Sequence, residues 1–399
     1  MKQISITIFL SILYVFLPAQ NACDGRYKDE IFSNVDVMTV NYSDVYYDNE
    51  HEMDIYTPYG DTVTNRPVII YMHGGSFYLG DKAMVDCVDF CTSFAKRGYV
   101  AISVNYRLAD MFSFLLSQDE QYRAVLRAVA DAKAAVRFLR RDYANGDSYG
   151  IDPGTVFVSG YSAGGVIAIH QAYIDDLSDL PNNVQALASA IGGNLEGDAG
   201  NLGYSSNVQA VVSLAGGIND LNWIDSNDEP IVMAQGTNDN TVSYYCGPGL
   251  NNPAILNLCG SGEIQPKAQQ AGVANDRLVF NGEGHNWAAS GNSNSKFNQA
   301  IGFFVDFLYD YIPCSITNSF DVTLENTFSF YPNPTKRSIK ISSHSSEELD
   351  IEISNLFGEI IYSNISVYSE EIINLDDLIP GIYFIKNKKS TEVRKLVIN

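Results

Sequence analysis

Residues 156–165 read VFVSGYSAGG, a short apolar run that leads directly into a G-x-S-x-G element. The apolar run predicts a buried strand, and the residues after the element have the periodicity of a helix. A sharp turn from strand to helix brings backbone segments close together, which explains glycines on both sides of the serine. Such a turn lifts the Ser162 hydroxyl clear of the sheet, and the N-terminus of the following helix favours negative charge beside it. Ser162 is therefore a candidate nucleophile.

Further apolar runs alternate with helical segments through the middle of the chain. The clearest helical segment spans residues 122–139, with apolar side chains on one face and charged ones elsewhere. Strands that alternate with helices predict an α/β fold, a mainly parallel sheet flanked by helices, whose ligands bind at the carboxyl ends of the strands. The predicted strands are 68–72, 99–104, 156–159, 208–214, 231–234 and 278–280.

A general base can be found by elimination, because the chain has only five histidines. His285 lies in the loop GEGH, just after the strand predicted at 278–280, and a loop histidine at the carboxyl end of a strand suits a base. His73 precedes Ser162 and is expected to orient its own loop. The other histidines lie near an N-terminal strand, on the helix behind Ser162, and in the C-terminal region: His51, His170 and His344.

The acid that orients the base is expected between Ser162 and His285, as in the chain order Ser, Asp, His. Asp239 lies in GTNDN, directly after the strand predicted at 231–234. The acidic residues at 225, 228 and 229 precede that strand and would emerge at its other end. Asp239 would hold the His285 tautomer and stabilise the imidazolium.

A Gly-Gly turn follows the strand predicted at 68–72 and leaves backbone N–H groups free to point at one spot. The N–H groups of Gly74, Gly75 and Ala163 are the candidates for an oxyanion hole. Residues beside the candidate catalytic positions in the sequence are candidates for the substrate pocket, although they could equally pack the core: Ser76, Phe77, Tyr78, Tyr161 and Trp287.

Two insertions interrupt the alternation, at residues 176–206 and 243–263. We expect both to overhang the carboxyl ends of the strands, and the first, which holds several apolar residues, to be the candidate lid. Six cysteines suggest disulfides in an exported chain. Cys246 and Cys259 bracket a Gly-, Pro- and Asn-rich loop in the second insertion and are the best candidate pair.

Composition narrows the class of protein. The chain has 399 residues with 46% hydrophobic residues, an ordinary globular composition. A formal net charge of −22 argues against a nucleic-acid partner. Residues 1–19 resemble a secretory signal peptide, with cleavage after Ala19 or Ala22, and the apolar run is too short to span a membrane. No Cys/His spacing indicates a metal site, and the candidate chemistry requires no cofactor.

The composition changes after residue 312. Residues 20–312 form the predicted α/β domain, residues 313–325 a linker rich in Ser, Thr and Asn, and residues 326–399 a small all-β sandwich. Within the last region, alternating strands are predicted at 338–342, 349–354, 359–363, 382–386 and 392–398.

Four motifs in this order resemble the carboxylesterase and hormone-sensitive-lipase branches of the α/β-hydrolases. They are IIYMHGGSFYLGDK, VFVSGYSAGG, GTNDNTV and GEGH, and the resemblance extends over about residues 45–312. It implies ester hydrolysis through an acyl-enzyme on Ser162, with His285 and Asp239 as the other triad members. The substrate would be a small ester or an ester-decorated polymer, with short-chain acyl or glycan-linked esters favoured.

The tail resembles the C-terminal sorting domain of type IX secretion cargo, through FYPNPT at 330–335, ISNLFG at 353–358 and PGIYF at 380–384. This implies contact with the type IX machinery and export across a bacterial outer membrane, to the medium or the cell surface. A carbohydrate-binding sandwich is the alternative for this region. For the whole chain, the alternatives are a lipase or polyester hydrolase of the same fold, a peptidase of that fold, and a non-catalytic binding protein.

Overall fold

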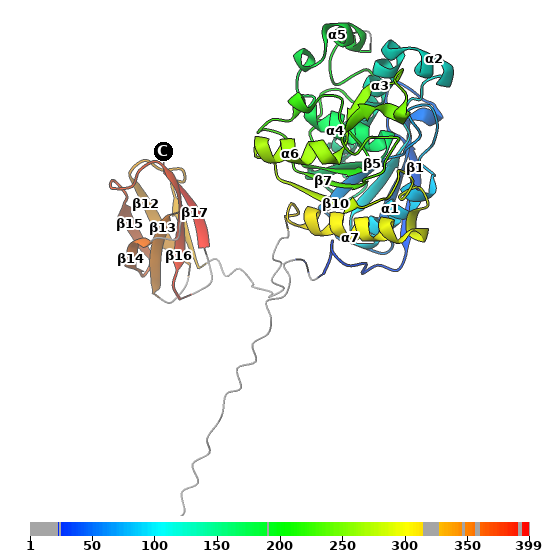
Figure 1. Ribbon diagram of the computed structural model, residues 1–399. Helices are drawn as coiled ribbons and strands as arrows, with labels where there is room; N and C mark the ends of the chain where they lie inside the picture. The colour runs from blue at the N-terminus through cyan, green and yellow to red at the C-terminus, as the bar shows by residue number, and fades with distance from the viewer. Residues whose placement is uncertain are drawn as a thin grey trace, which may run out of the picture. The chain divides into compact units, whose positions relative to one another are not determined.

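The computed structural model describes residues 23, 25–189, 191–313, 327–344, 348–355, 360–389 and 393–398 (Figure 1). Two compact units, Met1–Ser315 and Ile316–Asn399, divide the chain. The predicted signal peptide and all but the first residue of the predicted linker lie outside the described residues.

An eight-stranded sheet forms the centre of the first unit, in the order β1-β2-β4-β3-β5-β6-β7-β10. The first two strands join antiparallel to the edge of β4, and all the other neighbours are parallel. The predicted mainly parallel α/β architecture is therefore confirmed. The strands are β1 (Val35–Asn41), β2 (Glu52–Pro58), β3 (Arg66–Met72), β4 (Val100–Val104), β5 (Ile151–Tyr161), β6 (Ala210–Leu214), β7 (Ile231–Gly236) and β10 (Asn275–Phe280).

Helices cover both faces of this sheet (Figure 1). Alternate residues of β3 point into the two layers: Val68 and Ile70 pack with α3, α4 and α6, while Ile69 and Tyr71 pack with α1 and α7. This alternation follows from the period of two along a strand. The helices are α1 (Val85–Lys96), α2 (Met111–Leu116), α3 (Gln118–Ala144), α4 (Ala163–Tyr173), α5 (Asn182–Ser189), α6 (Ser261–Ala271) and α7 (Ser295–Tyr309).

Shorter elements connect these layers. A two-stranded hairpin, β8 (Cys246–Pro248) and β9 (Asn257–Cys259), forms most of the second insertion. Five single turns of 3-10 helix complete the described part of the unit: η1 (Asn49–His51), η2 (Leu177–Asp179), η3 (Leu221–Trp223), η4 (Gly249–Asn251) and η5 (Gly291–Ser293).

The second unit consists of two antiparallel sheets, β11-β12-β15 and β14-β13-β16-β17, around one apolar core. The predicted small all-β domain is thus confirmed. Its strands are β11 (Phe328–Tyr331), β12 (Ser338–Ser343), β13 (Leu349–Asn355), β14 (Ile360–Val367), β15 (Glu370–Asn374), β16 (Gly381–Asn387) and β17 (Val393–Ile398).

Sequence patterns missed several strands, for identifiable reasons. β1 is an edge strand whose Val37 and Met38 are half exposed, so the alternation of buried and exposed residues is lost there. β15 has a single buried residue, Ile373, among five. The strands of the hairpin have three residues each, too few for a periodic signal.

Candidate active site

Ser162 lies at the turn between β5 and α4, in a backbone conformation that side chains seldom adopt. Its φ is +56° with ψ −116°, outside the favoured regions. A Cβ at Gly164 would overlap the carbonyl oxygen of Met72 at the end of β3, so only glycine fits there. The turn is therefore fixed by close backbone contact, as the G-x-S-x-G pattern predicts.

Ser162 shares a hydrogen-bond chain with two loops at the carboxyl ends of neighbouring parallel strands. Its Oγ lies 2.7 Å from His285 Nε2, and His285 Nδ1 lies 2.7 Å from Asp239 Oδ2. The other oxygen of Asp239 accepts the backbone N–H groups of Thr241 and Val242 at 2.9 and 3.0 Å. The carboxylate is thereby oriented from both sides, and the ring of His285 is held between it and the serine.

The loops that carry Asp239 and His285 are joined directly. The N–H of Asn238 donates to Glu283 O at 2.9 Å, and the N–H of Gly282 donates to Thr237 Oγ1 at 2.8 Å. On the other side of the histidine, the Tyr161 hydroxyl donates to His285 O at 3.2 Å. These contacts set the position of the imidazole before any ligand binds, which is the preorganisation that catalysis needs.

The Gly-Gly loop after β3 lies against the nucleophile turn. A methyl group at Gly74 would lie 3.4 Å from Ser162 Cβ. His73 Nδ1 lies 2.6 Å from Gly74 O, and the N–H groups of Tyr78 and Leu79 donate to Gly75 O. Both carbonyls are thus tied back into the loop, which fixes the peptide planes. The N–H of Ala163 belongs to the first turn of α4, where no acceptor exists within the helix.

His73 is a positioning residue of this loop. Its ring is buried and stacks on Tyr106 with centroids 4.2 Å apart. Burial lowers the pKa of His73 to about 4, so the ring is neutral at pH 7 and its Nδ1–H donates to the Gly74 carbonyl. A neutral imidazole in this place supports the orienting role expected from the sequence.

A small pocket of about 50 Å³ opens beside Ser162. Of the predicted pocket residues, Ser76 and Phe77 line it, whereas Tyr78 packs behind its wall against Phe114. Sequence reasoning missed most of the wall. The remaining lining residues are Phe114, Ser162, Ala163, Val166, Thr241, Val242, Gly249, Leu250, Ile255 and Leu258.

Two of the aromatic residues predicted for the pocket, Trp287 and Tyr161, are not part of its described lining. Trp287 is 1% exposed and packs on Phe280 in the core beneath the histidine loop. Tyr161 is also buried, and its ring stacks on His285 with centroids 5.2 Å apart. Sequence proximity to a catalytic position does not reveal direction, because side chains alternate between the two faces along β5 and the chain turns between His285 and Trp287. Trp287 is a core residue, and Tyr161 positions the histidine.

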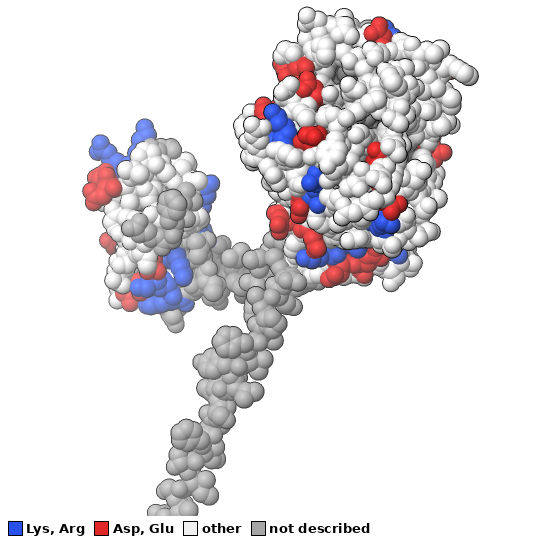
Figure 2. Space-filling model, in the orientation of Figure 1, with Lys and Arg blue, Asp and Glu red and all other residues white. Residues whose placement is uncertain are grey.

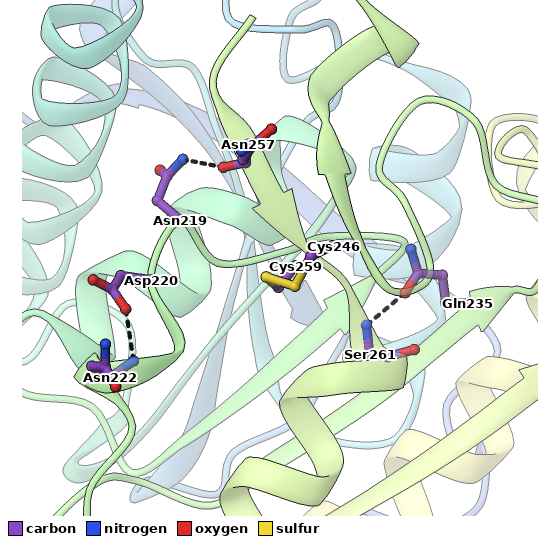
Figure 3. The surroundings of a disulfide bond; sticks show 8 residues. All are labelled: Asn219, Asp220, Asn222, Gln235, Cys246, Asn257, Cys259 and Ser261. Carbon is purple, nitrogen blue, oxygen red and sulfur yellow. Dashed lines mark hydrogen bonds between the residues drawn. A yellow bond between two sulfur atoms is a disulfide. The ribbon is translucent and has the colours of Figure 1, made fainter. Parts of the chain in front are cut away.

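The second insertion forms part of the pocket wall, and a disulfide closes it. Cys246 and Cys259 are bonded, with Cα atoms 4.0 Å apart, which confirms the predicted pair. Figure 3 shows that hydrogen bonds hold the chain on both sides of this disulfide. On one side Gln235 Oε1 accepts the N–H of Ser261 at 2.7 Å, and on the other Asn219 donates to Asn257 O at 2.7 Å. Leucines 250 and 258 enter the pocket from this hairpin.

The first insertion contributes nothing to the described lining of the Ser162 pocket, so the predicted lid over that pocket is wrong, although Leu180, Pro181 and Val184 lie beside the second insertion at a neighbouring cavity. Residues Leu180, Val184 and Ala188 form a small core of their own with Ile174, against the outer side of α3 and α4. Within the described residues, the lining of the Ser162 pocket takes nothing from 176–206. The cause is the direction of α4, which starts at the carboxyl ends of the strands and carries the chain back along the sheet before the insertion begins.

Comparison with known proteins agrees with this geometry. Residues 53–219 match the family BD-FAE, and residues 329–399 match the family described as secretion system C-terminal sorting domain. Within the first unit, the chain is similar to carboxylesterase-like α/β-hydrolases. Its second unit is a sorting domain, which indicates secretion across an outer membrane or attachment at its surface.

Among curated relatives, bovine (Bos taurus) arylacetamide deacetylase is 33% identical over 132 residues, 32% of this chain and 30% of that protein. The para-nitrobenzyl esterase of Bacillus subtilis (strain 168) is 32% identical over 135 residues, 33% of this chain and 26% of that protein. The chain therefore spans under a third of the length of these relatives.

Among solved structures, a truncated carbohydrate esterase from gut microbiota shares the fold at a TM-score of 0.51 and 20% identity, covering 71% of this chain and 97% of that one. Esterase 2 of Thermogutta terrifontis, phosphorylated by paraoxon, gives a TM-score of 0.51 at 21% identity, covering 70% and 95%. Both support the fold of the first unit.

The described residues include no cluster of three or more His, Cys, Asp or Glu side chains suited to a metal ion. None of the described helices is both long and apolar enough to cross a membrane. On the face drawn in Figure 2, basic side chains are interspersed with acidic ones and form no continuous stripe of the kind that binds phosphates.

Proposed function

We propose that the chain is a secreted serine esterase that hydrolyses short-chain acyl or glycan-linked carboxylic esters. The observation that carries this proposal is the unbroken chain of hydrogen bonds from Ser162 Oγ through His285 to Asp239, each 2.7 Å long. All three groups lie at the carboxyl ends of β5, β7 and β10, where ligands of such sheets bind.

The reaction starts with attack of Ser162 Oγ on the ester carbonyl carbon while His285 Nε2 takes the hydroxyl proton. Asp239 stabilises the resulting imidazolium and keeps its orientation. The imidazolium then protonates the alkoxide oxygen of the leaving alcohol, and the acyl-enzyme remains. Water, deprotonated by His285, attacks the acyl-enzyme and releases the acid and the free serine.

The oxyanion that forms at each step needs fixed donors. We assign this role to the N–H groups of Gly74, Gly75 and Ala163, because Gly74 lies against Ser162 and its peptide planes are held by the loop. Donors that need no rearrangement during the reaction contribute most to rate.

The pocket beside Ser162 sets the size of the acyl group. Its volume of about 50 Å³ and its walls of Phe77, Phe114 and Leu258 favour a short, apolar acyl chain. A series of p-nitrophenyl esters tests this. We expect the highest kcat/KM on acetate or butyrate, and a maximum on palmitate would exclude the assignment.

A second experiment tests the nucleophile directly. Incubation with paraoxon should transfer one diethylphosphoryl group to Ser162 Oγ and release 4-nitrophenolate, with the mass of the chain increased by that one group. The variant Ser162→Ala should gain no mass. Labelling of the variant to the same extent as the wild type would mean that another residue is the nucleophile.

One observation favours a second candidate, a lipase or polyester hydrolase. Helix α2 carries Phe112 and Leu116 at 74% and 85% exposure, next to Phe114 in the pocket wall. Exposed apolar side chains at a pocket mouth suit an apolar substrate surface. Higher activity on emulsified or polymeric esters than on dissolved ones would favour this candidate.

For export, we propose that the type IX secretion machinery recognises the second unit. The support is the match of residues 329–399 to the sorting-domain family. Removal of residues 316–399 should leave the esterase activity intact and abolish export in the native host, which enzyme assays of cell fractions would measure.

A further inference from the structure

A polar cavity of about 150 Å³ lies at the far end of α4 from Ser162. Its wall includes Gln171 near the end of that helix, Asp175 just after it, Glu229 just before β7, and Ser206 of the first insertion. Gln171 follows Ser162 by nine residues, about 14 Å at the rise of a helix. The cavity is therefore separate from the catalytic pocket, whose described lining includes none of these four residues.

The side chain of Gln171 is buried without a partner. It is 5% exposed, and neither its Oε1 nor its Nε2 has a hydrogen-bond partner among the described residues. Leaving a buried amide without partners costs free energy, so such groups are normally satisfied. Because this amide lies in the wall of the cavity, a molecule inside could donate to Oε1 and accept from Nε2 at the same time.

The cavity also carries negative charge that is not balanced. Of its carboxylates, Glu196 pairs with Arg137 and Lys133, whereas neither Asp175 nor Glu229 takes part in an ion pair in the described part of the chain. Burial raises the pKa of Asp175 and that of Glu229, and nearby carboxylates act in the same direction. A bound cation would offset both the burial and the repulsion, so the cavity favours a positively charged ligand.

The amide of Gln171 distinguishes between kinds of cation. A metal ion would bind Oε1, but the water around it donates hydrogen bonds and would leave Nε2 without an acceptor. A simple alkylammonium ion also lacks an acceptor. A molecule with a hydroxyl on the carbon next to its ammonium-bearing carbon meets both needs, because the ammonium donates to Oε1 and to a carboxylate while the hydroxyl oxygen accepts from Nε2.

The walls of the cavity are ordered before any ligand binds. The Tyr173 hydroxyl donates to Glu229 O at 2.9 Å, which joins α4 to the chain before β7. Ser206 Oγ donates to Glu196 Oε1 at 2.8 Å, which holds the wall contributed by the first insertion. Asp175 is exposed, so the cavity is accessible from solvent. Its volume gives room for about five water-sized groups, enough for a small organic cation.

We propose that this cavity binds a small vicinal amino alcohol in its ammonium form, of which ethanolamine is the simplest example. The ammonium lies between Gln171 Oε1 and the carboxylates of Asp175 and Glu229, and the hydroxyl oxygen faces Gln171 Nε2. The ligand joins the end of α4 to the first insertion, so it stabilises the first unit without taking part in ester hydrolysis. The inference goes beyond the proposed function and does not depend on it.

Calorimetric titration of the full-length chain with ethanolamine tests the site, at pH 8 and constant ionic strength. We expect one molecule per chain with a Kd on the order of 1 mM or lower, within the limit for so small a ligand. Ethylamine, which lacks the hydroxyl, should bind about fivefold more weakly, the effect of one hydrogen bond. Ethylene glycol, which lacks the charge, should not bind, and calcium chloride should not displace ethanolamine.

Variants locate the binding. Gln171→Leu removes both hydrogen-bonding atoms at similar volume and should weaken binding about tenfold. Glu229→Gln should also weaken it, and serves if the leucine variant fails to fold. The matched control Gln270→Leu changes an exposed amide of α6 outside the described lining and should bind as the wild type does. Ethanolamine should raise the melting temperature of the wild type and the control, but not that of Gln171→Leu.

Three results would overturn the inference. One is the absence of ethanolamine binding to the wild type, and another is equal binding to the wild type and Gln171→Leu. The third is ethylamine or calcium binding as tightly as ethanolamine, since the hydroxyl would then have no role. None of these results bears on the esterase assignment, which Ser162→Ala tests separately.

Discussion

The two insertions of the first unit lie beside one another at one cavity, yet of the two only the second appears in the described lining of the Ser162 pocket. Residues 243–263 follow a strand, begin at the carboxyl ends of the sheet and supply Leu250 and Leu258 to the pocket beside Ser162. Residues 176–206 follow a helix and pack on the outer side of α3 and α4. This difference follows from the direction of the element before each insertion. A strand ends at the edge of the sheet where ligands bind, whereas the helix that follows it runs back toward the opposite edge.

The insertions also differ in what holds them. The second one is closed by a disulfide, and the buried amide of Gln235 clamps both its ends by accepting from Ser261 N–H and donating to Val242 O. The first one is held by a small apolar core and by ion pairs, among them Arg107 with Asp198 and Lys133 with Glu196. A cross-linked loop can define the shape of a pocket, whereas a loop held by charges depends on pH and salt.

The largest effect is expected from removing the Ser162 hydroxyl, which lies in the pocket that the second insertion helps to form. Ser162→Ala should reduce kcat by about 10⁶, because the members of a triad act as a unit. The melting temperature should stay within a few degrees, since the change removes one hydroxyl. Steady-state assays with p-nitrophenyl acetate and calorimetry measure both. Retention of a tenth of the activity in a folded variant would show that the hydrolysis occurs elsewhere in the molecule.

Opening the disulfide should have the next largest effect. The bond spans a sequence separation of 13, for which loop entropy predicts about 3 kcal/mol of stabilisation. Cys246→Ala with Cys259→Ala should lower the melting temperature and also kcat/KM, because the pocket wall is then less ordered.

The comparison of the two insertions supplies the control. Leu195→Ala weakens the small core of the first insertion and should lower stability alone. If the cysteine variant had a lower melting temperature yet kept full kcat/KM on every ester, the hairpin would not shape the pocket. The two insertions would then both affect stability alone.

A third prediction concerns selectivity. Leu258 is half-buried in the pocket wall, and Leu258→Ala enlarges the space beside Ser162. We expect the ratio of kcat/KM for hexanoate to that for acetate to rise several-fold, since each extra methylene that can be buried contributes about 0.8 kcal/mol. Leu195→Ala should leave this ratio unchanged. An equal change in both variants would mean that the effect is general loosening.

The residues whose positions are set by turns and strand ends could be predicted from the sequence. Ser162, Asp239 and His285 each follow a recognisable strand, and parallel strands must bring such positions to one edge, so their contact could be predicted. The side chains that shape the pocket could not be predicted, because Phe114 comes from a short helix, and Leu250 and Leu258 come from a hairpin whose strands are too short for a periodic pattern. Apolar residues inside a loop bracketed by two cysteines were the available signal.

The direction in which an insertion leaves its preceding element was the second property that the sequence patterns did not predict. The apolar residues of 176–206 form a small buried face, but this face packs on the outer side of α3 and α4 and not over the Ser162 pocket. Following α4 along its length, 11 residues from Ser162, would have predicted the reversal. Trp287 shows the same limit on a smaller scale, since two positions after His285 the chain has already turned into the core.

The smallest predicted effect is a pH dependence at the cavity that Glu229 shares with the first insertion. Glu229 lines a polar cavity with Glu196 of that insertion and with Lys133. Burial raises the pKa of Glu229 to about 7, and the nearby Asp175 carboxylate acts in the same direction. Between pH 4.5 and 7 the folded chain therefore holds a proton that the unfolded chain releases. Stability falls as pH rises through this range, and the loss is complete above pH 7.

Glu229→Gln removes that loss, so the variant should exceed the wild type in stability at pH 8 and match it near pH 4. We expect a difference of about 1 kcal/mol, or about 2 °C in melting temperature, because solvent screens part of the effect. Asp228→Asn should act with the same sign, since burial also raises the pKa of Asp228 to about 7. Melting curves from pH 4 to 8.5 measure this. Parallel curves for wild type and Glu229→Gln would mean that this carboxylate is ionised in the folded chain throughout, and that the first insertion is no more sensitive to pH than the cross-linked second one.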